Sequence, residues 1–177
     1  MNLYLVTAIV VGALVFFFTL PFTLPHSWYR ELMYPGGRPN ALAKCLNSAQ
    51  ARLCAIGLMP ALMVGLETRG RRTGRPSLVP LVVAQVGSER YLVSMLGENS
   101  DWVRNVRASG GTAGLRHRGR EAVKLEEVPA SQRAPILKAY LKRAPGGRPH
   151  FDVDRNAPLA EFEKVAARYP VFRIVAA

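Results

Sequence analysis

The stretch ALMVGLETRGRRTGRPSLVPLVVAQVGSERYLVSML, residues 61–96, contains three apolar runs separated by two turn-forming segments. The runs are Ala61–Thr68, Leu78–Val86 and Tyr91–Leu96. Short runs rich in Val, Leu and Tyr are typical of β-strands, and glycines mark the turns between them. Because the links are too short to hold a crossover helix, successive strands are expected to run antiparallel. This stretch therefore predicts the core of an antiparallel sheet.

The sequence that follows predicts three further strands and three helices. Residues 100–108 are expected to form a short helix, with Ser100 as N-cap and Asp101 in the first turn. The remaining strands are expected at Ala113–His117, Val123–Val128 and Val171–Val175, and the remaining helices at Ser131–Arg143 and Pro158–Tyr169. Since strands dominate, the sequence predicts a mainly β, α+β fold: an antiparallel, barrel-like sheet decorated by helices.

A helical pattern precedes the strands. One apolar stripe is formed by six residues at helical spacing, Leu42, Cys45, Leu46, Ala49, Leu53 and Ile56. We expect this stripe to pack on the body of the protein; the alternative is a helix lying in a lipid surface, with Lys44 and Arg52 at the headgroups. Cys45 and Cys54 lie on opposite sides of such a helix and cannot pair within it. Two cysteines in all also exclude a disulfide-stapled scaffold.

The first 29 residues carry no Asp, Glu, Lys or Arg, so the formal net charge of +12 falls on the rest of the chain. The apolar run Leu3–Phe22 has the length of a helix that crosses about 30 Å of hydrocarbon. A cleaved signal peptide fits less well, because no basic residue precedes the run and no small-residue cleavage site follows it. The charged residues that follow the run are mainly basic: Arg30, Arg38, Lys44 and Arg52. Because basic residues tend to stay in the cytoplasm, this indicates that the rest of the chain lies on the cytoplasmic side.

These features predict a domain plan. We expect a membrane anchor over residues 1–29, a linker and amphipathic helix over 30–60, and a barrel domain over 61–177. The barrel domain would be tethered to the cell membrane on its cytoplasmic side, with membrane lipid as one partner.

Common catalytic signatures are missing from the sequence. His26, His117 and His150 stand alone, without a metal-ligand spacing. No serine-hydrolase elbow, phosphate loop or dinucleotide signature is present. Asp152 and Asp154 alternate on an expected loop, which is typical of solvated charge. The sequence therefore favours neither hydrolytic chemistry nor a protein-bound metal.

The basic turn, residues 69–75 (RGRRTGR), is the most informative chemical feature. Four arginines in seven residues, with Gly70 and Gly74 easing the backbone, are suited to binding an anion through guanidinium groups and free amides. Arg104 and Arg107 form a second basic pair on one face of the expected helix. Charge alone leaves an anionic cofactor, a lipid headgroup or a nucleic acid as ligand. Nucleic acid is the least favoured, because no reading motif accompanies the charge.

The order of four segments resembles the deazaflavin-dependent nitroreductase family of actinobacteria. These segments are TRGRRTGRP (68–76), PL (80–81), YLVS (91–94) and SDWVRNVRA (100–108). The resemblance covers residues 61–128 and, more loosely, the rest of the chain. It implies a split β-barrel and binding of the deazaflavin coenzyme F420, which carries a phosphate and an oligoglutamate tail. A homodimer is compatible with it, because split-barrel relatives are often dimers.

Carried over position by position, the resemblance implies a set of cofactor contacts. The phosphate and tail would be bound by Arg71, Arg72 and Thr73. The strand edge along the coenzyme would be Ser77, Leu78, Val79, Pro80, Leu81 and Val82. The ring system would be flanked by Leu92, Val93, Ser94 and Met95, with Ser94 as the polar contact at the reactive end. The helix would close the site with Asp101, Trp102, Val103, Arg104 and Asn105. Trp102 as a core residue and Asn105 as a helix cap are the alternatives.

The resemblance further implies hydride transfer from reduced F420 to an electron-poor acceptor, for which the protein need only position the reactants and exclude water. A membrane anchor favours a lipophilic acceptor such as a quinone, an enone or an unsaturated acyl compound. Three departures from the family affect the site. Met95 stands where many relatives have Lys, and the loop from Leu96 to Ser100 is shorter than in some relatives. The tyrosine-rich C-terminal substrate wall of the name-giving members is not evident, and residues 144–157 offer only His150 and Phe151 for such a wall. The alternatives are a flavin mononucleotide (FMN)-binding split-barrel reductase, a non-catalytic membrane-bound cofactor or lipid carrier, and a basic adaptor for acidic lipids.

Overall fold

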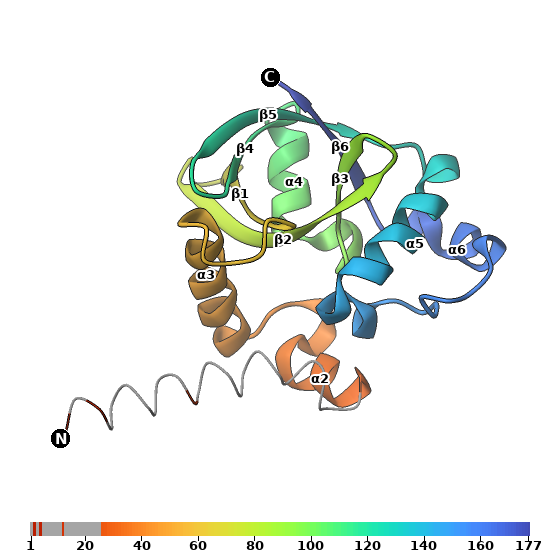
Figure 1. Ribbon diagram of the computed structural model, residues 1–177, viewed down its shortest axis with the longest axis horizontal. Coiled ribbons are helices and arrows are strands. Elements are labelled where there is room, and N and C mark those ends of the chain that lie inside the picture. Colours follow the sequence, from red (N-terminus) through yellow and green to blue (C-terminus); the bar gives the residue numbers. More distant parts are fainter. Residues whose placement is uncertain (1, 3, 5–11, 13–25) are drawn as a thin grey trace.

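The computed structural model of the protein describes residues 2, 4, 12 and 26–177 (Figure 1). Most of the expected anchor, Leu3–Phe22, lies outside these residues. Within the described part of the chain, no helix combines the length and the apolar character that crossing a bilayer requires.

The strands form a closed antiparallel barrel in the order β1-β2-β3-β6-β5-β4. Their bounds are β1 (Met63–Arg69), β2 (Pro76–Val86), β3 (Glu89–Val93), β4 (Thr112–Arg116), β5 (Arg120–Glu127) and β6 (Val171–Ala176). This confirms the expected antiparallel, barrel-like sheet and each of its strands. The third strand is shorter than expected and ends at Val93, because the chain then bends into a loop.

The barrel interior is filled by side chains from alternate strand positions and by three side chains of helix α4 (Asp101–Ala108). In the view of Figure 1, α4 is seen through the ring that the strands form. Trp102, Val103 and Val106 of this helix are buried, and the Trp102 ring meets that of Phe172 at 5.4 Å between centroids. The expected helix is thus confirmed. Ser100 is its N-cap residue, as expected: the Ser100 carbonyl accepts from the Arg104 amide at 3.2 Å, whereas the Ser100 side chain makes no capping bond.

A second core lies outside the barrel, on β2 and β3. Ala84, Tyr91 and Val93 face it, whereas Val83 and Leu92 face the interior, as the alternation of a strand requires. Helices α5 (Arg133–Arg143) and α6 (Leu159–Val165) cover this outer face. Short 3-10 helices complete the connections: η1 (Pro35–Gly37), η2 (Gly97–Asn99), η3 (Ala130–Gln132), η4 (Pro145–His150) and η5 (Ala166–Arg168).

Helix α3 (Ala41–Ala55) is present as expected, but the predicted direction of its apolar stripe is wrong. The helix buries small residues, Ala43, Ala51 and Cys54, while Leu42 is 56% and Ile56 64% exposed. Small side chains bring the helix backbone close to β1, where a Cβ on Gly65 would lie 3.1 Å from the Ala51 carbonyl oxygen. Close packing has therefore selected the small-residue face; Leu42 and Ile56 face outward, whereas Leu46 and Leu53 are half-buried.

Helix α2 (His26–Met33) precedes α3 and forms a third, smaller core with it. Tyr29 and Met33 of α2 are buried with Tyr34 and with Ala43 of α3. Met95 and Leu96, from the loop after β3, pack against the same cluster. The segment between the expected anchor and α3 is thereby fixed against the loop that follows the third strand.

Candidate active site

The basic turn closes on itself between β1 and β2. The Gly70 amide donates to the Arg75 carbonyl at 2.9 Å, and the Gly74 amide donates to the Gly70 carbonyl at 2.8 Å. Gly74 has a φ of +65°, which favours glycine, and a Cβ on Gly70 would lie 2.8 Å from the Thr73 hydroxyl. The backbone conformation therefore requires glycine at position 74, and Gly70 leaves room for the Thr73 hydroxyl.

Arg71 ties this turn to helix α4. Its backbone amide and its Nη1 both donate to Asn105 Oδ1 at 3.1 Å, and Nη1 also donates to Asp101 at 3.0 Å. Asn105 is buried, so it orients the turn from inside the protein rather than capping its helix. The structure thus joins the two segments that carry the resemblance, the basic turn and the helix after β3.

The other arginines of the turn keep their charge available. Among the residues that the structure describes, Arg69, Arg72 and Arg75 form no ion pair. Three unneutralised guanidinium groups beside an exposed Thr73 fit the phosphate and carboxylates of an anionic cofactor such as F420.

The second predicted basic pair is engaged elsewhere. Arg104 donates to Asn99, and Arg107 pairs with Glu98 at 2.5 Å and with Glu127 at 2.7 Å. These two arginines are structural contacts in the described protein, in contrast to those of the basic turn.

The predicted strand edge alternates between two sides of β2. Val79 and Leu81 pack into the barrel, whereas Val82 packs against the α5–α6 core and Leu78 lies beside Gly65 of β1. All six residues, Ser77, Leu78, Val79, Pro80, Leu81 and Val82, are partly exposed. One ligand on the outer face can contact only the outward half of this set through side chains.

The residues after β3 shape a loop instead of presenting free polar groups. The Ser94 hydroxyl is buried; it donates to the Gly97 carbonyl at 2.8 Å and lies 2.8 Å from the Ser100 hydroxyl. Leu92 and Val93 are fully buried in different cores. Trp102, which is 7% exposed, and Val103 lie in the barrel core. This agrees with the alternative that Trp102 is a core residue. Of the four predicted ring contacts, Met95 alone lines the cavity described next.

A cavity of about 670 Å³ opens beside this loop. Its walls come from α2 and η1, the loop after β3, and the segment around η4 and η5: Arg30, Glu31, Tyr34, Pro35, Gly36, Gly37, Met95, Leu96, Gly97, His150, Asp152, Arg168 and Tyr169. The resemblance missed the wall from α2 and η1, because those residues precede the segments that carry it. No local sequence pattern links Tyr34 to Met95 and Leu96, so the sequence gives no signal for this long-range contact.

His150 is the buried polar residue of this cavity. Its ring meets the Tyr34 ring edge-on, with centroids 4.7 Å apart, and Tyr29 lies on a further side at 6.4 Å. Burial, reinforced by the nearby charge of Arg30, lowers the pKa of His150 from 6.5 to about 4, so the imidazole is neutral at pH 7. Within the described residues, its Nε2 is buried and has no hydrogen-bond partner.

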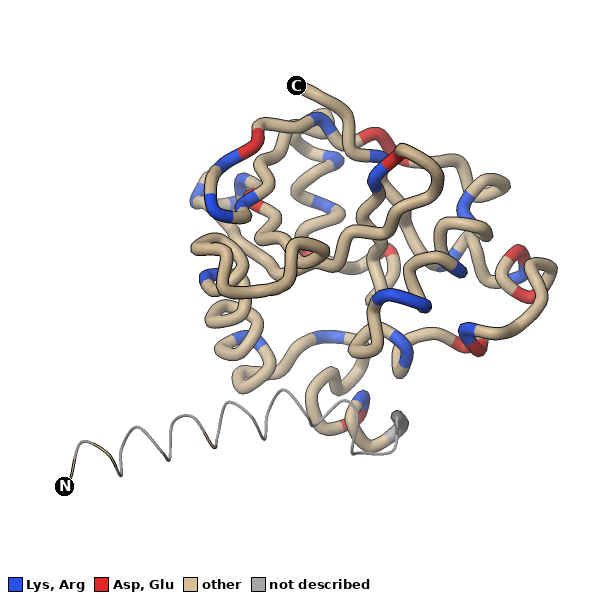
Figure 2. Tube along the Cα trace, in the orientation of Figure 1, with Lys and Arg blue, Asp and Glu red and all other residues tan. Residues whose placement is uncertain are grey.

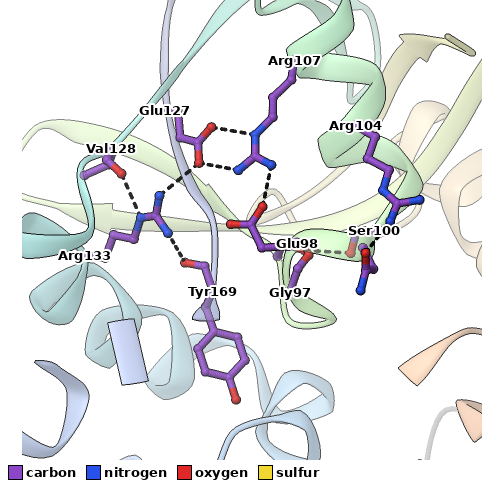
Figure 3. A network of polar contacts seen from close by, with 11 residues as sticks. Gly97, Glu98, Ser100, Arg104, Arg107, Glu127, Val128, Arg133 and Tyr169 are labelled. Carbon is purple, nitrogen blue, oxygen red and sulfur yellow. Dashed lines mark hydrogen bonds and ion pairs between the residues drawn. The ribbon is translucent and has the colours of Figure 1, made fainter. Parts of the chain in front are cut away.

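An arginine network, formed by Glu98, Arg107, Glu127 and Arg133, supports one side of the cavity (Figure 3). Arg133 donates to the Val128 carbonyl at 2.8 Å, to the Tyr169 carbonyl at 3.4 Å and to Glu127 at 3.0 Å. The pKa of Glu127 lies below its usual range, mainly because of the hydrogen bond from Arg107 and to a smaller extent because of Arg133. Because Glu98 belongs to η2 and Tyr169 lines the cavity, the network fixes two of its walls.

A known family model covers the basic turn and most of the barrel domain. The family model described as F420H(2)-dependent quinone reductase matches residues 49–159. The chain belongs to this family; it is an oxidoreductase, and its cofactor is coenzyme F420. A comparison with curated proteins gave no match.

Three solved structures are similar to this chain. An F420-H2 dependent reductase shares 19% identity, with 66% of this chain and 96% of that chain covered and a TM-score of 0.45. An F420 reductase shares 14%, covering 71% and 91% with a TM-score of 0.42. A domain-swapped dimer shares 18%, covering 86% and 100% with a TM-score of 0.47. At these values the likenesses carry no conclusion about acceptor or assembly.

Proposed function

We propose that this protein transfers a hydride from reduced F420 to a lipophilic, electron-poor acceptor, with a quinone as the first choice. An enone or an unsaturated acyl compound has the same electrophilic character. The observation that carries the proposal is the basic turn, whose unpaired arginines are held at a fixed place by the Arg71–Asn105 contact. Family membership supports the same chemistry.

The side chains divide the work of binding. Arg72, with Thr73, Arg69 and Arg75 beside it, would bind the phosphate and the acidic tail. Arg71 contributes by keeping the turn against α4. The outward side chains of Ser77–Val82, together with Met95, would border the ring system, and Ser94 and Trp102 act through the loop and core that they stabilise. When bound, the reduced coenzyme supplies the hydride; the chain positions both reactants and excludes water.

Attachment to the cytoplasmic face of a membrane is part of the proposal. The outward faces of α2 and α3 expose Trp28, Leu32, Leu42, Ile56 and, just after α3, Leu58. Lys44 and Arg52 accompany them, as in helices that lie at a lipid surface. The apolar run Leu3–Phe22 precedes these helices directly and would act as the single anchor. A homodimer remains an expectation of the resemblance.

The activity is tested with the full-length protein in lipid nanodiscs, reduced F420 and 2-methyl-1,4-naphthoquinone. We expect reduced F420 to be oxidised at a rate that depends on the quinone concentration. We expect no activity when reduced FMN replaces reduced F420. Activity with FMN alone would favour the FMN-dependent alternative. Tight F420 binding without turnover of any quinone, enone or unsaturated acyl compound would favour the non-catalytic carrier.

Contact with lipid is tested by the fluorescence of Trp28 in vesicles that contain bromine-labelled lipids. The chain has two tryptophans, and Trp102 is buried in the barrel. The Trp28→Phe variant reports Trp102 alone, and the difference between the wild type and this variant gives the signal of Trp28. We expect the bromolipid to quench Trp28 and to leave Trp102 unaffected. Equal emission of Trp28 with and without bromine would contradict the lipid-facing orientation.

A further inference from the structure

The turn between β4 and β5 is a second basic segment, distinct from the basic turn after β1. Residues 116–120 read RHRGR, and we call them the basic hairpin. Arg116 and Arg120 share one carboxylate, that of Glu67, at 2.7 and 3.0 Å. Arg118 is exposed and forms no ion pair with any residue that the structure describes. The basic hairpin therefore carries more positive charge than its acidic neighbour balances.

The backbone of Arg118 has a conformation that glycine adopts most easily. Its φ of +57° lies in the left-handed region, and among the described residues it is the one non-glycine residue there. Glycine enters this region without a steric penalty, and Gly119 is the next residue in the chain. Backbone strain of this kind is found mainly at positions that have a functional role. The strain therefore points to a role for the arginine side chain.

The side chain of Arg118 lies over the end of α3. A Cβ on Gly57 would lie 2.1 Å from the Arg118 Cγ and 2.9 Å from its Nε. Ile56 and Leu58, the two neighbours of Gly57, are 64% and 71% exposed. Figure 1 shows the turn between β4 and β5 beside this end of α3. An arginine with its aliphatic stem along apolar surface and its charged end in water is typical of a membrane interface.

The basic hairpin and the basic turn lie at opposite ends of β1. Arg116 pairs with Gly65, and the antiparallel register directs the rest of the hairpin toward Met63, where the strand begins. The basic turn follows Arg69, where the strand ends. The length of β1 separates the two segments by about 20 Å, at about 3.3 Å per residue. A phosphate bound at the basic turn therefore lies out of reach of Arg118.

The apolar neighbours of Arg118 favour a lipid surface over a soluble anion. An acidic peptide tail would use the guanidinium group but would gain nothing from the exposed Ile56 and Leu58. A membrane of acidic lipids offers phosphate at the level of the headgroups and hydrocarbon just below them. Lys44 and Arg52 are also exposed on α3 and add positive charge to the helix. The charge and the exposed apolar side chains therefore match one and the same partner.

We propose that the basic hairpin is a binding site for the phosphate groups of acidic membrane lipids, with Arg118 as its main contact. Ile56 and Leu58 enter the apolar layer beside it. The inference rests on the proposed membrane attachment and adds a lipid class and a second point of contact to it. Guanidinium groups bind phosphate through paired donors, so Arg118 is suited to this ligand. With an anchor at one end of the chain, this contact sets how the barrel is oriented on the membrane.

The test measures how closely the hairpin approaches lipid in the full-length protein. Trp28→Phe removes one tryptophan, and Leu58→Trp places an indole beside Arg118, while the buried Trp102 gives a constant background. The protein is reconstituted in vesicles of pure phosphatidylcholine, or of two parts phosphatidylcholine to one part phosphatidylglycerol, brominated near the headgroups. Because the anchor keeps each chain on its vesicle, quenching of the new indole measures docking of the hairpin. We expect stronger quenching in the acidic vesicles, and a decrease when salt is added.

Three further changes are compared in this parent protein. Arg118→Gly removes the guanidinium group and relieves the backbone strain, and Arg118→Lys keeps the charge. Arg155→Gly is the matched control, because Arg155 is exposed and unpaired among the described residues but lies in the loop before α6. In acidic vesicles, Arg118→Gly should lower the docking equilibrium constant about fivefold, the effect of one basic residue near such a surface. Arg118→Lys should retain most of the docking, and Arg155→Gly all of it.

Thermal unfolding separates this loss from a structural defect. Since glycine suits the left-handed backbone at position 118, we expect the Tm of Arg118→Gly to equal or exceed that of the parent. A variant that is at least as stable and yet docks less well supports a role for the side chain in binding lipid. Equal docking of Arg118→Gly and the parent in acidic vesicles would overturn the headgroup site.

The remaining outcomes separate this inference from the proposed function. Equal quenching of the parent in both lipid mixtures would overturn the headgroup site but leave the membrane attachment in place. Weaker F420 binding by Arg118→Gly would assign the hairpin to the acidic tail of the coenzyme and would also overturn the lipid site. Quenching in neither mixture would contradict the proposed lipid-facing orientation itself, and this inference with it.

Discussion

The basic turn and the arginine network carry the same kind of charge, yet they differ in what surrounds it. Arg107 and Arg133 are paired with Glu98 and Glu127, and the Arg133 side chain is 8% exposed. In the basic turn, Arg71 alone has a carboxylate partner among the described residues. One group of arginines holds the fold together; the other retains its charge for a ligand.

The difference follows from where the acidic residues lie. The chain has 24 basic and 12 acidic residues, and Figure 2 shows blue segments along the whole described trace but red ones at few places. A carboxylate next to an arginine satisfies its donors and lowers its value as an anion receptor. The sequence position of the acids therefore decides which arginines are structural.

The largest effect on stability is expected for Arg133→Ala in the arginine network. The change leaves the carbonyls of Val128 and Tyr169 without this donor and removes a buried charge partner from Glu127. We expect the free energy of unfolding to fall by about 3 kcal/mol, measured in urea. Arg168→Ala, which breaks an exposed ion pair, is the control and should cost less than about 1 kcal/mol. Equal losses would remove the distinction between the network and the surface pairs.

A smaller effect is expected for Asn105→Ala, which weakens the connection between the basic turn and α4. The backbone amide of Arg71 loses its acceptor, and its side chain keeps only the exposed contact with Asp101. We expect a loss of about 1–2 kcal/mol in unfolding free energy and a fall of roughly tenfold in F420 affinity, because the turn is held less firmly. Asn105→Asp keeps an oxygen acceptor and should retain most of both. If Asn105→Ala binds F420 normally, the Arg71–Asn105 contact has no part in the site.

The smallest effect is a pH dependence of the arginine network. The pKa of Glu127 is lower in the folded protein than its ordinary value of 4.5, mainly because of Arg107. Its stabilising contribution is present above pH 4.5 and is lost as the pH falls through the lowered pKa. We expect Tm to fall less steeply with acidification in Glu127→Gln than in the wild type. An identical slope would show that the network does not depend on this charge.

Local patterns were enough to predict the strands, the helix at α4 and the barrel-like sheet, because each depends on alternation and turn chemistry within a few residues. Three features depend on distant partners and were not predictable. Leu42 and Ile56 of the apolar stripe face outward because Gly65, in another element, favours the small-residue face of α3. Arg107 is neutralised by Glu127 on β5. The cavity joins Tyr34 to His150, which are far apart in the sequence.

The central claim is that the unpaired arginines of the basic turn bind the coenzyme, and a fluorescence titration of the full-length protein with F420 tests it most directly. The double variant Arg72→Ala/Arg75→Ala is compared with Arg90→Ala/Arg173→Ala, which removes the same charge from arginines paired with Glu121, Glu89 and Glu126. Loss of two charge-assisted contacts should raise the Kd about 100-fold in the turn variant, with about a twofold change or less in the control. Wild-type affinity in the turn variant, or an equal loss in both, would contradict the account.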